Sequence, residues 1–171
     1  RILEHCGEPR KSAILDEIKK CHKKLLDDQY GNYVIQHVLQ FGREEDRDSI
    51  LQIVVESGLL GMSRQKFASN VVEKLLKYGN GNQRCAVVRE MLKPADDPSF
   101  PTDPADGRAS VVLLMVRDAY ANYVVQTTLD VAPESDEKRL LFEELNCHAE
   151  ELRNYTFAKH IVAKLSSMSG H

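Results

Sequence analysis

The sequence lacks any long hydrophobic run. Of its 171 residues, 42% are hydrophobic and 29% are charged. No apolar stretch approaches the ~18 residues that mark a membrane-spanning helix. The composition is typical of a globular, soluble chain and not of a disordered or fibrous one. A membrane role is excluded, and the length suffices for one sizeable core or for a stack of small units.

Cysteine and histidine are few and scattered. No Cys-x-x-Cys pair occurs among the four cysteines, Cys6, Cys21, Cys85 and Cys147, so reduced thiols are expected and a zinc site is not. The six histidines show no triad or metal-ligand spacing with them. A nucleophile elbow, a P-loop and a paired glycine loop are also missing. We therefore expect no enzyme activity, no metal, no cofactor and no small-molecule substrate.

A secretory signal is absent as well. No charged n-region leads into an apolar h-region, which predicts a cytoplasmic protein. In that compartment the glycosylation triplet Asn154-Tyr155-Thr156 is a chance match. The chain begins at Arg1 without a methionine, and we expect it to be a piece of something longer.

The sequence has no excess of basic residues. Its 23 Lys and Arg face 26 Asp and Glu, which gives a formal net charge of -3. Because cations drive phosphate binding, this balance argues at first sight against a nucleic-acid partner. The acidity lies elsewhere, however, since a combined +2 is carried by the four repeated segments 30–42, 67–79, 120–132 and 157–168.

What the sequence does contain is an internal repeat. Related segments begin with an aromatic residue at Tyr30, Phe67, Tyr120 and Phe157, at offsets of 37, 53 and 37 residues. The long interval holds the segment 93–108, with four of the six prolines, which is typical of a surface insertion between repeats. The first six residues align with 37–42, so the N-terminus is the tail of an earlier repeat.

Each repeated segment has helical periodicity. At about 100° per residue, apolar and small residues fill one half of the first helix, Tyr30, Val34 and Phe41 among them. A column of small residues should let neighbouring helices approach closely, at Gly31, Ala68, Ala121 and Ala158. Apolar periodic stretches at 50–55 and 140–145 predict more than one helix per unit. The predicted fold class is an all-α solenoid.

Solvated helix faces are usually filled with Glu, Lys and Arg. Positions three and seven of these helices instead repeatedly carry neutral amides, or Ser with Glu. Asn32 and Gln36 lie four apart on one face, and Tyr33 stands beside them. The same Asn-Tyr-x-x-Gln set recurs as Asn122, Tyr123 and Gln126. A ring flanked by two amides, repeated along a solenoid, is suited to unpaired bases.

The donors and acceptors of these side chains suggest which bases they select. Asn and Gln amides together can match the two carbonyls and one N–H of a uracil edge. The middle helix has Ser69 and Glu73 instead. An ionised carboxylate only accepts hydrogen bonds, and guanine offers it two adjacent N–H donors. The three helices should therefore read U, G and U.

The three signatures together resemble the last repeats of the Pumilio (PUF) RNA-binding domain, over nearly the whole chain apart from 93–108. The resemblance implies a right-handed α-α superhelical solenoid of ~36-residue repeats that reads one base per repeat. Its RNA runs antiparallel, so the third signature would take the first base of 5'-UGU. The implied divisions are a truncated repeat at 1–22, repeats at 23–58, 59–92 and 109–147, the insertion 93–108, and a C-terminal cap at 148–171.

The resemblance also implies roles for single residues. Base edges would be contacted by Asn32, Gln36, Ser69, Glu73, Asn122 and Gln126, and bases would stack on Tyr33, Asn70 and Tyr123. The cap has Lys159, His160 and Ala163 at the three positions; Ala163 cannot hydrogen-bond a base, while His160 could still stack. Phosphate candidates are Lys74, Lys77, Lys159 and Lys164, although Lys74 and Lys77 could equally be solvated surface residues.

Two functions of different classes follow. The first is a single-stranded RNA reader of UGU in the 3' untranslated regions of messenger RNA, with a deadenylase or translational repressor complex as the implied partner. The second is a helical scaffold of the HEAT or armadillo type that holds an extended peptide. The Ser-Asn-x-x-Glu exception among the Asn-Tyr-x-x-Gln signatures favours the reader. Outer helices or the insertion could also dock a protein.

Overall fold

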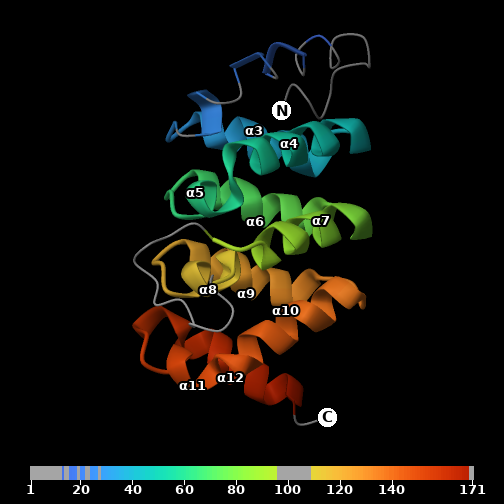
Figure 1. Cartoon of the computed structure of the whole chain (residues 1–171). Helices are drawn as coiled ribbons and strands as arrows, with labels where there is room; N and C mark the ends of the chain where they lie inside the picture. The colour runs from blue at the N-terminus through green and yellow to red at the C-terminus, as the bar shows by residue number, and fades with distance from the viewer. Residues whose placement is uncertain are drawn as a thin grey trace.

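Helices stack one below another from the N-terminus to the C-terminus of the chain (Figure 1). The computed structural model describes residues 13, 16–18, 20–21, 24–26, 28–95 and 109–169. The helices are α3 (Gly31–Phe41), α4 (Glu44–Ser57), α5 (Leu59–Ser63), α6 (Ala68–Tyr78), α7 (Gly81–Leu92), α8 (Val111–Val116), α9 (Ala121–Val131), α10 (Asp136–Cys147), α11 (Ala149–Leu152), η1 (Thr156–Ala158) and α12 (Lys159–Ser169). The predicted all-α solenoid is confirmed.

The longer helices form two layers, in which corresponding helices of successive repeats pack side by side. The first layer consists of α3, α6, α9 and α12, and the second layer of α4, α7 and α10. The short helices α5, α8 and α11 lead from each second-layer helix to the next first-layer helix. Each complete unit therefore contributes three helices, which confirms the prediction of more than one.

The apolar residues of the stacked helices form one continuous core. In α6, Val71, Val72, Leu75 and Leu76 are each at most 1% exposed. Their spacing covers two adjacent strips of the helix, so α6 packs against its first-layer neighbours and against α7 at the same time. Burying each of these side chains stabilises the fold by roughly 1.5–3 kcal/mol. The repeats are held together by this shared core.

Three residues that the helical wheel placed on the apolar half are exposed in the structure. Tyr30 precedes the first turn of α3 and is 73% exposed, and Phe41 is the last residue of that helix. Val34 is 39% exposed, whereas its equivalents Val71 and Val124 are fully buried. In α6 and α9 this position belongs to the shared core. The helical wheel alone therefore does not determine burial.

The column of small residues is confirmed as a site of close approach. Ala68, Ala121 and Ala158 are at most 1% exposed. At Gly31 a Cβ atom would lie 2.8 Å from both the Cα and the carbonyl oxygen of Leu25. Backbone cannot give way as a flexible side chain can, so this position accepts glycine alone.

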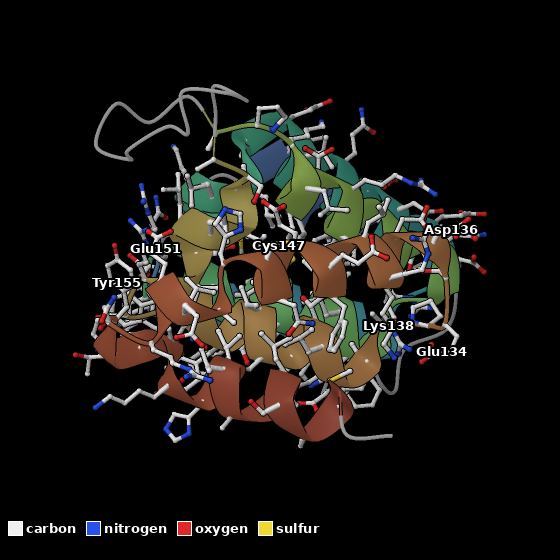
Figure 2. All side chains as sticks on the ribbon, turned by 60° about the horizontal axis from the view of Figure 1, so that its bottom comes forward. Glu134, Asp136, Lys138, Cys147, Glu151 and Tyr155 are labelled. Carbon is white, nitrogen blue, oxygen red and sulfur yellow. The ribbon has the colours of Figure 1, made fainter. Side chains whose placement is uncertain are left out.

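Polar contacts flank the C-terminal end of the stack on two opposite sides (Figure 2). On one side, Lys138 of α10 forms an ion pair with Glu134, which precedes that helix. On the other side, Glu151 of α11 pairs with Arg117, whose guanidinium carbon lies 4.0 Å from the ring centroid of Tyr155. Arg117 directly follows α8. This second group therefore ties the last described repeat to the one before it.

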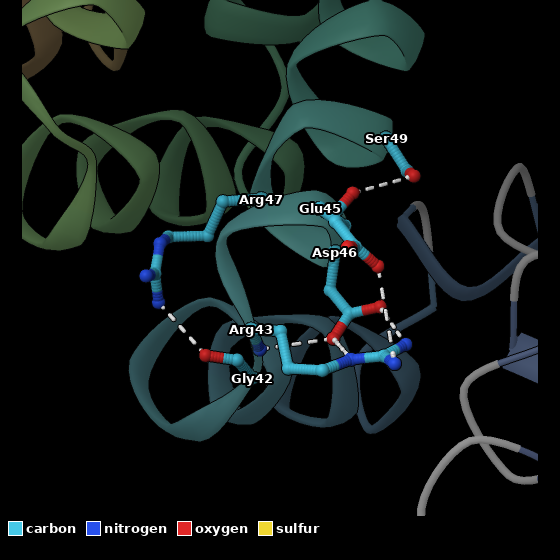
Figure 3. Close-up of polar contacts among 6 residues, drawn as sticks. All are labelled: Gly42, Arg43, Glu45, Asp46, Arg47 and Ser49. Atoms are coloured by element: carbon cyan, nitrogen blue, oxygen red, sulfur yellow. Dashed lines mark hydrogen bonds and ion pairs between the residues drawn. The ribbon is translucent and has the colours of Figure 1, made fainter.

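The turn from α3 into α4 is fixed by a buried carboxylate and two arginines (Figure 3). Asp46 is 1% exposed and accepts hydrogen bonds from the backbone N–H of Arg43, at 2.9 Å, and from its guanidinium, at 3.2 Å. The guanidinium of Arg47 donates to the carbonyl oxygen of Gly42 at 2.9 Å. These contacts satisfy backbone groups that a helix end leaves without partners. The turn therefore fixes how α3 of the first layer meets α4 of the second.

The proline-rich insertion leaves the solenoid and re-enters it at neighbouring points. The backbone N–H of Ala95 donates to the carbonyl of Ala109 at 2.7 Å, and that of Val111 donates to the carbonyl of Lys93 at 2.9 Å. Pro94 and Ser110 form an isolated antiparallel bridge between these two bonds. Most of the predicted insertion, 96–108, lies outside the described residues, as does most of the predicted truncated repeat at 1–22.

Candidate nucleic-acid interface

The two Asn-Gln pairs have the same internal geometry in α3 and α9. Gln36 Nε2 donates to Asn32 Oδ1 at 2.7 Å, and Gln126 Nε2 donates to Asn122 Oδ1 at 2.9 Å. Asn32 Nδ2 in turn donates to the carbonyls of Asp28 and Gln29. Asn122 Nδ2 makes the matching bonds in α9, to the carbonyls of Asp118 and Ala119. The asparagines thus tie the glutamines to the turn before each helix.

This arrangement distinguishes the two amides of a pair. Asn32 and Asn122 are only 1% and 3% exposed, whereas Gln36 and Gln126 are partly exposed. Each glutamine keeps its Oε1 and its second Nε2 hydrogen as an adjacent acceptor and donor. Sequence reasoning placed both amides at the base edge. In the structure the glutamine amide is partly accessible at the surface. The asparagine amide is buried and donates both of its hydrogens to backbone carbonyls.

The corresponding position in α6 carries a carboxylate in a different setting. Ser69 is 3% exposed and donates to the carbonyl of Lys66 at 3.3 Å. Glu73 lies within reach of Lys77 Nζ, at 4.0 Å, and of Thr127 Oγ1 on α9, at 3.4 Å. Partial burial raises the pKa of Glu73, while Lys77, the Thr127 hydroxyl and Lys74 act to lower it. The site therefore presents only acceptors where its neighbours present an amide.

Two tyrosine rings stand exposed beside the polar pairs. Tyr33 is 66% exposed and Tyr123 is 56% exposed. Asn70 takes the same place in α6, is exposed, and donates to the carbonyl of Lys66 at 3.1 Å. Each ring lies three residues before the glutamine of its own helix, so that ring and amide share one side of the helix. Each ring can offer a π-face to a flat ligand.

Most of the predicted phosphate contacts have intramolecular partners. Lys74 Nζ lies 5.4 Å from the ring centroid of Tyr78, and Lys77 faces Glu73. Lys164 forms an ion pair with Asp130. Lys159 and His160 of the cap are exposed, and so is Ala163, which offers no hydrogen-bonding group. A phosphate would have to compete for three of the four lysines. Two of these contacts have the i,i+4 spacing of neighbours on one helix, whereas the Lys164–Asp130 pair joins two repeats and was not foreseeable from spacing.

Carboxylates that the sequence reasoning passed over fix where two first-layer helices begin. Asp28 Oδ1 accepts from the backbone N–H groups of Tyr30 and Gly31, at 2.9 and 2.6 Å. Asp118 makes the same two bonds to Tyr120 and Ala121. The signal was an aspartate two residues before the leading aromatic, in DQY and DAY, where Asx turns are common. By shaping this turn, Asp28 and Asp118 position the carbonyls to which Asn32 and Asn122 bind.

Within the described residues, no helix is long and apolar enough to cross a membrane. No group of three or more His, Cys, Asp or Glu side chains among them could hold a metal ion.

A model of the Pumilio-family RNA binding repeat matches this sequence four times, at residues 1–19, 28–55, 59–92 and 112–145. The chain belongs to the Pumilio family. Each of the last three matches contains one of the three signatures, so the family repeat and the polar pairs recur together. The expected resemblance is confirmed.

Relatives of known sequence support this membership. The chain is 36% identical to the mRNA-binding protein puf3 of Schizosaccharomyces pombe over 93% of its own length, and 30% identical to Pumilio homolog 12 of Arabidopsis thaliana over 97%. It spans only 20% and 26% of those two proteins. The similarity therefore concerns one part of each relative and not its full length.

Solved Pumilio-family structures share the fold. A crystal structure of PUF-8 in complex with PBE-RNA superposes with a TM-score of 0.81 at 33% identity, covering 97% of this chain and 45% of that one. The Puf3 RNA binding domain bound to site B of the Cox17 RNA 3' UTR recognition sequence gives 0.76 at 31%, covering 96% and 48%. The predicted right-handed α-α superhelical solenoid is confirmed.

Proposed function

We propose that the chain binds single-stranded RNA sequence-specifically and reads 5'-UGU, with α9, α6 and α3 taking the three bases in that order. The observation that carries the proposal is the succession of polar groups along the first layer. Amide pairs with one geometry occupy α3 and α9, and a carboxylate occupies the same position in α6. A general RNA binder would have no need for this alternation.

The amide pairs suit uracil. With its position fixed by Asn32, Gln36 presents a donor beside an acceptor, which is complementary to a uracil carbonyl beside the ring N–H. Tyr33 is placed to stack on a neighbouring base, and stacking of this kind contributes ~1–3 kcal/mol per base. Gln126 and Tyr123 repeat the arrangement in α9.

The carboxylate suits guanine. Glu73 can accept from two adjacent N–H groups of the guanine edge in charge-assisted bonds. A uracil would instead place a carbonyl oxygen against it, and two acceptors repel each other. The partial burial of Glu73 strengthens this discrimination, because water cannot easily compensate for a missing donor.

The modest charge of the first layer supports base reading over phosphate attraction. Three of the four candidate lysines already have partners in the protein. Each phosphate contact steepens the fall of affinity with salt. We therefore propose that affinity rests mainly on stacking and base-edge bonds, and that it falls less steeply with salt than for a strongly basic binder.

The wider role is proposed from the family. The proposal includes binding in 3' untranslated regions, recruitment of a deadenylase or translational repressor complex, a cytoplasmic location and no catalytic activity of the chain itself. A peptide-binding scaffold of the HEAT or armadillo type has no feature of the first layer in its favour, since peptides do not call for amide pairs interrupted by one carboxylate.

The test exchanges the α6 signature for that of its neighbours. Binding of UGU, UUU and UCU RNAs is compared at one salt concentration for the native chain and for Ser69→Asn with Glu73→Gln. The carbonyls of Gln65 and Lys66 stand where Asp28 and Gln29 bind Asn32, so the exchanged amides can form the same pair. We expect the preferred middle base to change from G to U, a swing of roughly 1–3 kcal/mol.

Two controls sharpen the test. Glu73→Gln alone should lose the preference for G while gaining less for U, because its amide has no asparagine behind it. Glu56→Gln makes the same change of charge on α4 in the second layer, where Glu56 accepts a hydrogen bond from Gln52, and should leave base preference unchanged. A double variant that still prefers G would refute the assignment of base edges.

A further inference from the structure

One hydrogen bond joins a base-edge side chain to the next repeat. The hydroxyl of Thr127, on α9, lies 3.4 Å from Oε2 of Glu73, on α6. Thr127 is 7% exposed, so its side chain sits in the seam between the two helices. The neighbouring repeat thus contributes the Thr127 hydroxyl to the site around Glu73, which is otherwise formed by α6.

The next residue of α9, Thr128, directs its hydroxyl differently from Thr127. A threonine inside a helix commonly donates to the carbonyl four residues earlier, and Thr128 does so, to Val124 at 2.8 Å. Thr127 instead donates out of its helix to Glu73. Of these two adjacent threonines, Thr128 therefore makes a hydrogen bond within α9, whereas Thr127 makes one to the preceding repeat.

The other first-layer helices hold different residues at the position of Thr127. They carry His37, Lys74 and Lys164, and Lys164 lies 3.5 Å from the backbone oxygen of Gln126 in the preceding repeat. The position thus adjoins the base-edge residue of the repeat before it. Beside the carboxylate, a lysine would form an ion pair that competes with a guanine. Lys77 Nζ already lies 4.0 Å from Oε2 of Glu73. A neutral hydroxyl at position 127 orients this oxygen without adding a second cation beside it.

We infer that Thr127 is a specificity-determining positioning residue for the base read by α6: its hydroxyl orients Glu73 toward guanine without adding a positive charge beside the carboxylate. The inference rests on the proposed function, because it assigns a second residue to the same base site. It extends the reading unit across the repeat boundary, so that the base opposite α6 is selected by side chains of two helices.

The experiment measures binding of UGU and UUU RNAs to the full chain at one salt concentration. Thr127→Val keeps the shape but removes the hydroxyl, and it should lower the G-over-U ratio about threefold to tenfold. Thr127→Ser restores the hydroxyl and should return the ratio to the native value. Thr128→Val removes the neighbouring hydroxyl and should leave the ratio unchanged. In a Glu73→Gln background, Thr127→Val should no longer alter the ratio.

The outcomes separate the two claims. A native chain that binds UGU and UUU equally would overturn the proposed function and this inference with it. A native preference that persists unchanged in Thr127→Val would overturn the inference alone. Weaker binding of both RNAs by the same factor would show Thr127 to be structural only, and would also overturn it. Thermal unfolding of each variant, followed by circular dichroism, identifies losses that come from unfolding.

Discussion

Replacing Arg84 with methionine should destabilise the chain by about 3 kcal/mol, because its guanidinium closes the ends of two adjacent first-layer helices. Nε donates to the carbonyl of Leu76 at 2.8 Å, and Nη2 to that of Lys77 at 3.0 Å, both in the last turn of α6. Nη1 reaches the next repeat and donates to the carbonyl of Val131, at the end of α9, at 3.0 Å.

The magnitude follows from which of these bonds water can replace. A hydrogen bond from a charged donor contributes about 1.5–3 kcal/mol. The bonds to Leu76 and Val131 are partly buried, and the bond to Lys77 is exposed, so its carbonyl can be rehydrated. Two bonds at the lower end of the range give about 3 kcal/mol. Methionine retains most of the aliphatic stem, which limits any added loss of packing.

Arg47 provides the matched control, since it occupies the same place one repeat earlier. It donates to the carbonyls of Gly42 and Leu39, at 2.9 and 3.4 Å, and both belong to the end of α3. With one short bond and no contact to the next repeat among these, Arg47→Met should cost about half as much, near 1.5 kcal/mol.

Urea denaturation of both variants, followed by circular dichroism, measures the free energies of unfolding from the midpoint and the slope. Equal destabilisation by the two substitutions would refute the claim that the bond between repeats matters. A loss below about 0.5 kcal/mol for Arg84→Met would refute the energy assigned to the buried carbonyls. Because Arg84 ties α6 to α9, its replacement should also weaken RNA binding without changing which base is preferred.

Two further outcomes are expected. Tyr33→Ala should weaken RNA binding by roughly 1–3 kcal/mol through lost stacking, with little change in melting temperature because the ring is exposed; unchanged affinity would make it a mere surface residue. Burial raises the pKa of Glu73 in the folded state, so its ionisation costs stability at neutral pH and this cost fades as pH falls through that pKa. Glu73→Gln should therefore raise the melting temperature at pH 7 and less toward pH 4; the opposite trend would contradict the sign.

The sequence was sufficient for features that depend on local periodicity. The leading aromatics predicted where the first-layer helices lie, and α3, α6 and α9 each begin at the residue that follows one. The small column and the apolar strips also followed from spacing, because a residue buried in every repeat recurs in every repeat. The alternation of amide and carboxylate was visible for the same reason.

The features that could not be predicted from the sequence depend on which residues lie next to each other in the folded structure. Val34 and Val71 are equivalent in sequence but differ in burial, at 39% and 0% exposed, and the periodicity of a single helix cannot distinguish them. The retracted position of Asn32 depends on two carbonyls that the preceding turn happens to orient. The partner of Thr127 lies 54 residues away in the chain, and no pattern within one helix could have indicated it.

The two ends of the proline-rich insertion are hydrogen-bonded to each other. The length of the insertion therefore does not set the distance between the base-reading helices on either side of it. Between Lys93 and Val111 the backbone leaves and returns through paired hydrogen bonds, while α6 and α9 pack as directly as α3 and α6 do. Doubling a flexible loop costs only ~0.6 kcal/mol of closure entropy. Evolution or an engineer can therefore lengthen, shorten or replace this segment, down to a tagged or ligand-responsive module, while successive bases still meet their readers one repeat apart.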